Sequence, residues 1–148
     1  MRALPLLLAV VLAACSSGPS GPVTESGALE VGDLTLQSGE YSDVYSVSAG
    51  EGQWISVTLE ADGFDPYLII RTPSGQQSDI DDSEEGNTTS TSTVLRASEA
   101  GSYDVIVTSF QSGETGSYSV TYEVSDTQPG ATPAADDTEE TSEEETTT

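Results

Sequence analysis

The sequence predicts an all-β protein whose single domain is an antiparallel β-sandwich, jelly-roll-like and built from about seven or eight short strands. Apolar side chains recur with a period of two, as in residues 54–59, where Ile55, Val57 and Leu59 alternate with a tryptophan and two hydroxyl side chains. Turn-forming residues, mainly Gly, Pro, Ser and Asp, separate these runs. No window of eleven or more residues shows the helical period of 3.6, so helices are not expected.

Residues 1–14 have the pattern of a secretory signal peptide. Arg2 precedes an apolar run over residues 3–14 that is interrupted only by Pro5. This run is too short to span a bilayer as a helix, which takes about 20 residues. The next residues favour a lipid anchor instead, because Leu-Ala-Ala-Cys at 12–15 resembles the lipobox of bacterial lipoproteins.

The lipobox resemblance implies cleavage before Cys15 and acylation of Cys15, with palmitate as a typical chain, so that lipid alone attaches the protein to the membrane. Ser16 stands where Asp is the retention signal in many Gram-negative lipoproteins, which by the same resemblance implies the outer membrane. The alternative is an ordinary signal peptide with an incidental cysteine. Cys15 is the single cysteine, so a disulfide within the chain is not expected.

Two segments without apolar periodicity flank the predicted domain. Residues 15–26 combine the lipidated Cys15 with a Gly, Ser and Pro mixture that is typical of a flexible tether. Residues 126–148 hold eight carboxylates and no basic residue, which predicts a disordered acidic tail that either attracts cations or serves as a tolerated spacer. Residues 27–125 remain as one domain, large enough to bury a core without disulfides.

The strands expected in this domain are short and rich in β-branched and aromatic residues. They cover residues 44–47, 54–59, 67–70, 93–96, 103–107 and 118–124, with one or two more over 29–36. Gly-Ser-Tyr occurs at both 101–103 and 116–118, which predicts that the last two strands form a hairpin through residues 111–115. Residues 74–92 are expected to form one long loop.

The order of short motifs in the domain resembles that of the bacterial pre-peptidase C-terminal domain. The motifs are Asp-Val-Tyr-Ser-Val at 43–47, Ala-Gly-Glu-Gly at 49–52, Phe-Asp-Pro-Tyr-Leu at 64–68, Asp-Asp at 81–82 and the two Gly-Ser-Tyr repeats. The resemblance implies a non-catalytic β-sandwich that assists secretion, localisation or substrate contact. The resemblance also implies calcium binding, as in some collagenase members of that family.

The charge of the chain excludes several classes of function. It has 26 Asp and Glu against three Arg, with no Lys and no His, which gives a formal charge of −23. A protein binds nucleic acids and anionic lipid surfaces through Lys and Arg side chains, so neither is an expected partner. The usual general bases and Schiff-base amines are also missing, so an enzyme is not expected. Such acidity without Lys suggests a halophilic, cation-rich environment.

Four carboxylates are the candidate metal ligands: Asp65, Asp79, Asp81 and Asp82. Calcium takes six to eight oxygens from carboxylates and carbonyls, and the acidic loop with Asp65 supplies several of them. The family resemblance points to Asp81 and Asp82 as well. The alternative is a solvated acidic loop, with Asp65 simply ending a turn before Pro66.

Trp54 is the candidate binding residue, because its alternation with Ile55 places it on the solvent face of its strand. Two functions follow. The first is a non-catalytic envelope lipoprotein whose sandwich binds a periplasmic or extracellular polysaccharide, peptide or envelope protein. The second is a calcium-stabilised structural or localisation domain without a specific ligand.

Overall fold

The computed structural model describes residues 20–81 and 89–130, and these residues form nine β-strands and no helix. No segment of this described part is a helix that could cross a membrane. The strands are β1 (Ser20–Leu29), β2 (Leu34–Thr35), β3 (Tyr41–Ala49), β4 (Trp54–Asp62), β5 (Pro66–Arg71), β6 (Gln77–Ile80), β7 (Ser90–Arg96), β8 (Gly101–Ser109) and β9 (Gly116–Ser125). The prediction of an all-β fold is confirmed.

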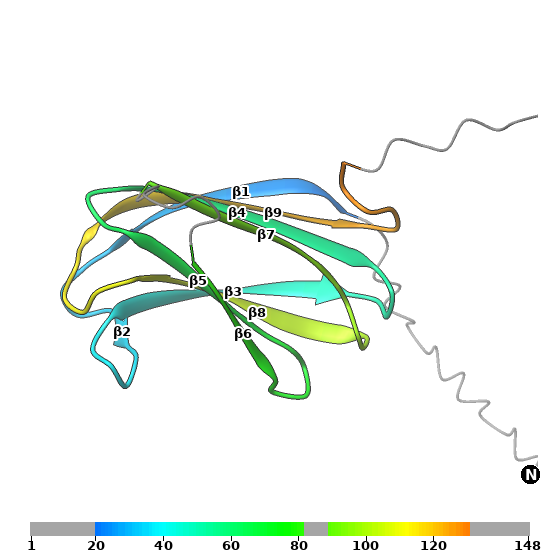
Figure 1. Cartoon of the computed structure of the whole chain (residues 1–148), viewed down its shortest axis with the longest axis horizontal. Helices are drawn as coiled ribbons and strands as arrows, with labels where there is room; N and C mark the ends of the chain where they lie inside the picture. The colour runs from blue at the N-terminus through cyan, green and yellow to red at the C-terminus, as the bar shows by residue number, and fades with distance from the viewer. Residues whose placement is uncertain (1–19, 82–88, 131–148) are drawn as a thin grey trace, which may run out of the picture.

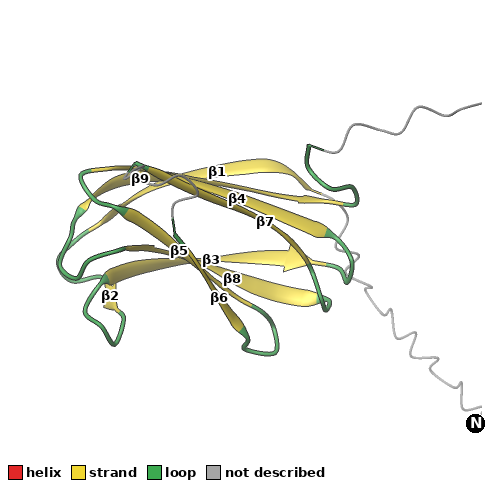
Figure 2. Ribbon diagram, viewed as in Figure 1, coloured by secondary structure: helices red, strands yellow, loops and turns green. Residues whose placement is uncertain are grey.

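Two antiparallel sheets pack face to face (Figures 1 and 2). One has four strands in the order β1-β9-β4-β7, and the other has five in the order β2-β3-β8-β5-β6. In Figure 1 the four-stranded sheet lies above the five-stranded sheet. The predicted β-sandwich is therefore present, with one or two strands more than expected.

The core lies between the two sheets and follows the period of two read from the sequence. On β4, Ile55, Val57 and Leu59 are at most 1% exposed, whereas the residues between them point away from the core. They belong to the same buried cluster as Leu68 of β5 and Val105 of β8. Burial of one face is what fixes this register, because a shift by one residue would turn the apolar set to solvent.

A polar cluster joins the sheets near one end of the core. The hydroxyl of Tyr118 donates to Asp43 Oδ2 at 2.6 Å and lies 2.7 Å from the hydroxyl of Tyr45. The Tyr118 ring is 4% exposed and packs edge-on against Phe64. Burial, followed by the hydrogen bond to Asp43, raises the pKa of Tyr118 far above its usual value of 10. Gly27 on β1 makes room for this ring.

Three local expectations are corrected, beginning with the tether. Residues 20–26 were expected in a flexible segment, but they form the first part of β1, which pairs with β9 from Ser20↔Val124 to Leu29↔Gly116. Such an edge strand is held by backbone hydrogen bonds to a single neighbour, so its side chains can stay polar and exposed. The pairing is irregular between Ser20 and Val23, where Pro22 lies, and an edge strand tolerates proline.

The expected long loop over residues 74–92 is also wrong in part. It contains β6, which pairs with β5, and the beginning of β7. The residues of β6, Gln-Ser-Asp-Ile, lack alternation because three of the four are exposed at the sheet edge. Residues 82–88 lie outside the described part of the chain.

The third correction concerns the last two strands. β8 and β9 do not form a hairpin, because β8 lies between β3 and β5 in one sheet and β9 lies between β1 and β4 in the other. Residues 111–115 therefore connect the two sheets. The repeated Gly-Ser-Tyr pattern marks an equivalent start of each strand, but it carries no information on which sheet receives it.

Candidate functional site

The outer face of the five-stranded sheet carries apolar residues where an exposed face would carry polar ones. Ile69 of β5 and Ile106 of β8 lie side by side on this face and are 7% and 2% exposed. Their row continues to Val44 on β3 and Asp79 on β6. A sheet face of this kind is either covered by another segment or used for binding.

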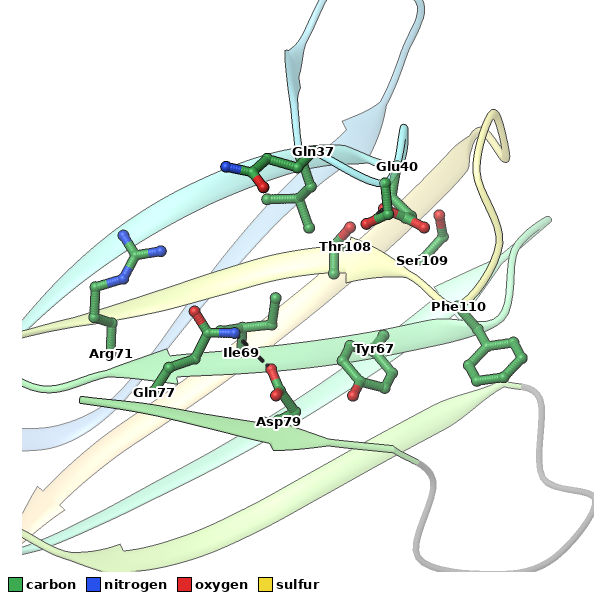
Figure 3. A pocket seen from close by; sticks show the side chains of 12 residues that line it. Gln37, Glu40, Tyr67, Ile69, Arg71, Gln77, Asp79, Thr108, Ser109 and Phe110 are labelled. Atoms are coloured by element: carbon green, nitrogen blue, oxygen red, sulfur yellow. Dashed lines mark hydrogen bonds between the residues drawn. The ribbon is translucent and has the colours of Figure 1, made fainter. Parts of the chain in front are cut away.

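A groove of about 600 Å³ lies over this face. Its floor is formed by Tyr67, Ile69 and Arg71, which are alternate residues of β5. One wall is the loop of residues 36–40, closed by a hydrogen bond from the Leu36 N–H to the Glu40 carbonyl at 2.9 Å. Gln77 and Asp79 of β6 form the other wall, and Figure 3 shows the floor between the two.

An aromatic pair occupies one end of the groove. The rings of Tyr67 and Phe110 are 6.3 Å apart at 50° to each other, and the Phe110 side chain is 54% exposed. The backbone fixes this pair, because the Phe110 N–H donates to the Asp65 carbonyl, just before β5, at 2.9 Å. An exposed aromatic beside a partly buried one is a common feature of binding surfaces.

Charged and amide side chains line the rest of the groove. Gln77 Nε2 donates to Asp79 Oδ1 at 2.8 Å, and Ser38 Oγ donates to Glu40 Oε2 at 2.5 Å. Arg71 lies at the opposite end of the groove from the aromatic pair (Figure 3). Its Nη1 is 4.0 Å from Asp104 Oδ2. Partial burial, followed by the nearby charges of Asp79 and Asp81, raises the pKa of the Tyr67 hydroxyl above its usual value. The aromatic end is therefore negatively charged.

The four predicted metal ligands do not form a common cluster in the described part of the chain. Asp65 lies in the turn before β5, Asp79 on β6 and Asp81 directly after β6, while Asp82 lies outside the described residues. The Asp81 carbonyl accepts a hydrogen bond from Thr91 Oγ1 at 2.7 Å. Among the described residues no three metal-ligating side chains gather in one place. The calcium site stays a prediction. Of the four residues, Asp79 lines the groove.

Trp54 lies on the other sheet, on the face turned away from the core. It is partly buried, and its cross-strand neighbours are Arg96 of β7 and Ser125 of β9. This face otherwise carries mostly Ser and Thr. The groove on the five-stranded sheet does not extend to it. A binding role for Trp54 stays a prediction.

The sequence contains a signal for the groove in the strands β5 and β8. Residues 67–70 and 105–107 are apolar at consecutive positions, so both faces of β5 and β8 carry large side chains. A sheet in an antiparallel sandwich normally has one face toward the core and one toward solvent, so its strands alternate apolar and polar residues. A continuous apolar run therefore indicates that the outer face is covered or forms a binding surface.

The chain matches no protein-family model and no curated protein sequence. Its fold is similar to that of the pre-peptidase C-terminal domain of collagenase from Bacillus anthracis, at 19% identity and a TM-score of 0.50, over 68% of this chain and 87% of that one. It also matches the periplasmic g-type lysozyme inhibitor PliG of Aeromonas hydrophila, at 15% identity and a TM-score of 0.49, over 70% and 85% of the two chains. The first likeness shows that the two chains share a β-sandwich fold.

Proposed function

We propose that the protein is a non-catalytic binding module of the bacterial cell envelope, attached to the membrane by lipid on Cys15, and that it binds a partner in the groove on the five-stranded sheet. The observation that carries the proposal is the groove with the exposed Phe110 and its ring partner Tyr67 at one end. Aromatic side chains are enriched at protein–protein interfaces relative to the rest of the surface.

The position of β1 supports this arrangement. β1 begins at Ser20, five residues after Cys15, so the chain between them reaches at most about 18 Å. The end of the sandwich that holds Ser20 and its partner Val124 would therefore lie close to the membrane. The last residues that the structure describes, up to 130, lie at this same end in Figure 1.

The aromatic pair of the groove lies at the opposite end of the sandwich. Gly116, which pairs with Leu29 at the far end of β1, touches the turn of residues 62–64. The Asp65 carbonyl that follows this turn holds the Phe110 N–H. A lipid on Cys15 would thus leave Phe110 directed away from the membrane, where a partner can reach it.

Photo-cross-linking in intact cells tests the proposal. A photoreactive phenylalanine analogue placed at Phe110 is expected to give discrete cross-linked products, and the same analogue at Trp54, on the other sheet, is expected to give none. Products from position 54 alone would move the binding surface to the four-stranded sheet. No product from either position would contradict a binding module and favour the accessory domain without a specific ligand.

The anchor is tested in the same cells by Cys15→Ser. The variant is expected to leave the membrane fraction and the detergent phase. A variant that still partitions with detergent would contradict the lipid anchor without affecting the assignment of the groove.

A further inference from the structure

We infer that the groove binds a positively charged side chain, lysine or arginine, presented by an extended segment of a partner protein. The inference rests on the proposed function and adds the chemistry of the partner. It follows from the distribution of charge along the groove, from its aromatic end and from its length.

The charges along the groove are unequal. Asp79 lies on one wall beside Tyr67, Glu40 lies on the opposite wall, and Asp81 follows directly after β6. Arg71 is the cation among the lining residues, and it lies at the far end near Asp104. The aromatic end thus carries negative charge on both sides (Figure 3).

This combination favours a cation over other ligands. The faces of Tyr and Phe attract ammonium and guanidinium groups, and the attraction grows when the site is partly desolvated. A carboxylate has about four acceptor positions, so the hydrogen bond from Gln77 leaves Asp79 able to accept from a ligand. The effect of Asp79 and Asp81 on the Tyr67 pKa shows that their field reaches this ring.

The length of the groove indicates a polypeptide segment instead of a small amine. Its floor runs over β5 from Tyr67 to Arg71, four residues apart, which is about 13 Å in a strand. A single ammonium group would fill only the aromatic end. An extended segment would also run past Ile69 and place polar backbone groups near Gln77. An anionic polymer is disfavoured by a chain of charge −23.

The experiment is calorimetric titration of the full chain, in neutral detergent and about 0.15 M salt, with a capped hexapeptide of alternating serine and lysine. The glutamate counterpart of this peptide and cellohexaose are the comparison probes. Asp79→Asn and Phe110→Ala are each expected to weaken binding of the lysine peptide about fivefold to tenfold. Both side chains are exposed, so the melting temperature should stay close to that of the parent chain.

Two matched variants separate the groove from general attraction to an acidic surface. Glu60→Gln removes one carboxylate from the exposed face of β4, and Trp54→Ala removes an aromatic side chain from the same sheet. Both are expected to change the affinity less than twofold. Equal losses for Asp79→Asn and Glu60→Gln would overturn the inference, as would no binding of the lysine peptide.

Tighter binding of cellohexaose, unaffected by Asp79→Asn, would also overturn the inference and identify a saccharide groove. The proposed function fails separately, when Phe110 gives no cross-linked product in cells. Cross-links at Phe110, together with an affinity for the lysine peptide that Asp79→Asn leaves unchanged, would therefore reject the cationic partner. The proposal of a binding module would still stand.

Discussion

Tyr118→Ala is expected to lower the free energy of unfolding by about 3–5 kcal/mol, the range for a large buried aromatic cut back to alanine. The ring is 4% exposed and packs edge-on against Tyr45 and Phe64, with centroids 6.4 Å away in each case. Its loss opens a cavity between the two sheets and removes the donor that holds Asp43 at 2.6 Å. Urea denaturation of the variant and the parent chain measures the effect.

Tyr118→Phe separates the two contributions. It keeps the ring and removes the hydrogen bond to a carboxylate, which is expected to cost about 1.5–3 kcal/mol. A loss below about 1 kcal/mol for Tyr118→Ala would contradict the placement of this side chain in the core.

Gly27→Ala supplies a second, independent check on the same ring. A Cβ atom at Gly27 would lie too close to the Tyr118 hydroxyl, which Asp43 and Tyr45 hold in place. The substitution is expected to cost about 1–3 kcal/mol in the parent chain and almost nothing when combined with Tyr118→Ala. Equal costs in both backgrounds would mean that β1 does not press against this ring.

Gly116→Ala is expected to destabilise the fold by about 3 kcal/mol, at the upper end of the range for overpacking. A Cβ atom there would overlap the carbonyl oxygen of Asp62 and touch the Phe64 ring. Because the first of these contacts is with backbone, no side-chain rotation relieves it. The turn that would have to move leads into Asp65 and β5, so binding in the groove is expected to weaken as well.

Gly21→Ala is the matched control for this substitution. Nothing lies within 4 Å of a Cβ atom at Gly21, which is exposed on β1. Its effect on the free energy of unfolding is expected to stay within about 0.5 kcal/mol. Thermal or urea unfolding that found equal losses for the two variants would contradict the close approach of β9 to the turn.

The central strands could be predicted from the sequence because burial leaves a mark on side chains. Ile55, Val57 and Leu59 alternate with polar residues since only one face of β4 meets the core. β1 and β6 carry no such mark, because backbone hydrogen bonds to a single neighbour hold them. Edge strands of this kind cannot be recognised from apolar periodicity.

The groove could be predicted only in part. Apolar side chains on both faces of β5 and β8 indicate a covered or binding surface, but they do not say what lies over it. The wall at residues 36–40 and the aromatic residue Phe110 are about 70 positions apart in the sequence. Only the pairing of β3 with β8, from Ser42↔Thr108 onward, brings them together. Carboxylate clusters and a tryptophan can be recognised locally in the sequence. The groove cannot, because it depends on the pairing of strands that are distant in the sequence.

The central claim is that partners bind on the five-stranded sheet, and chemical-shift mapping on the isotopically labelled full chain tests it most directly. On addition of the serine–lysine hexapeptide, the largest amide shifts are expected at residues 36–40, 67–71, 77–79 and 108–110. The residues around Trp54 should move little. Shifts concentrated around Trp54 or in the acidic residues 131–148, with none in the groove, would contradict the account.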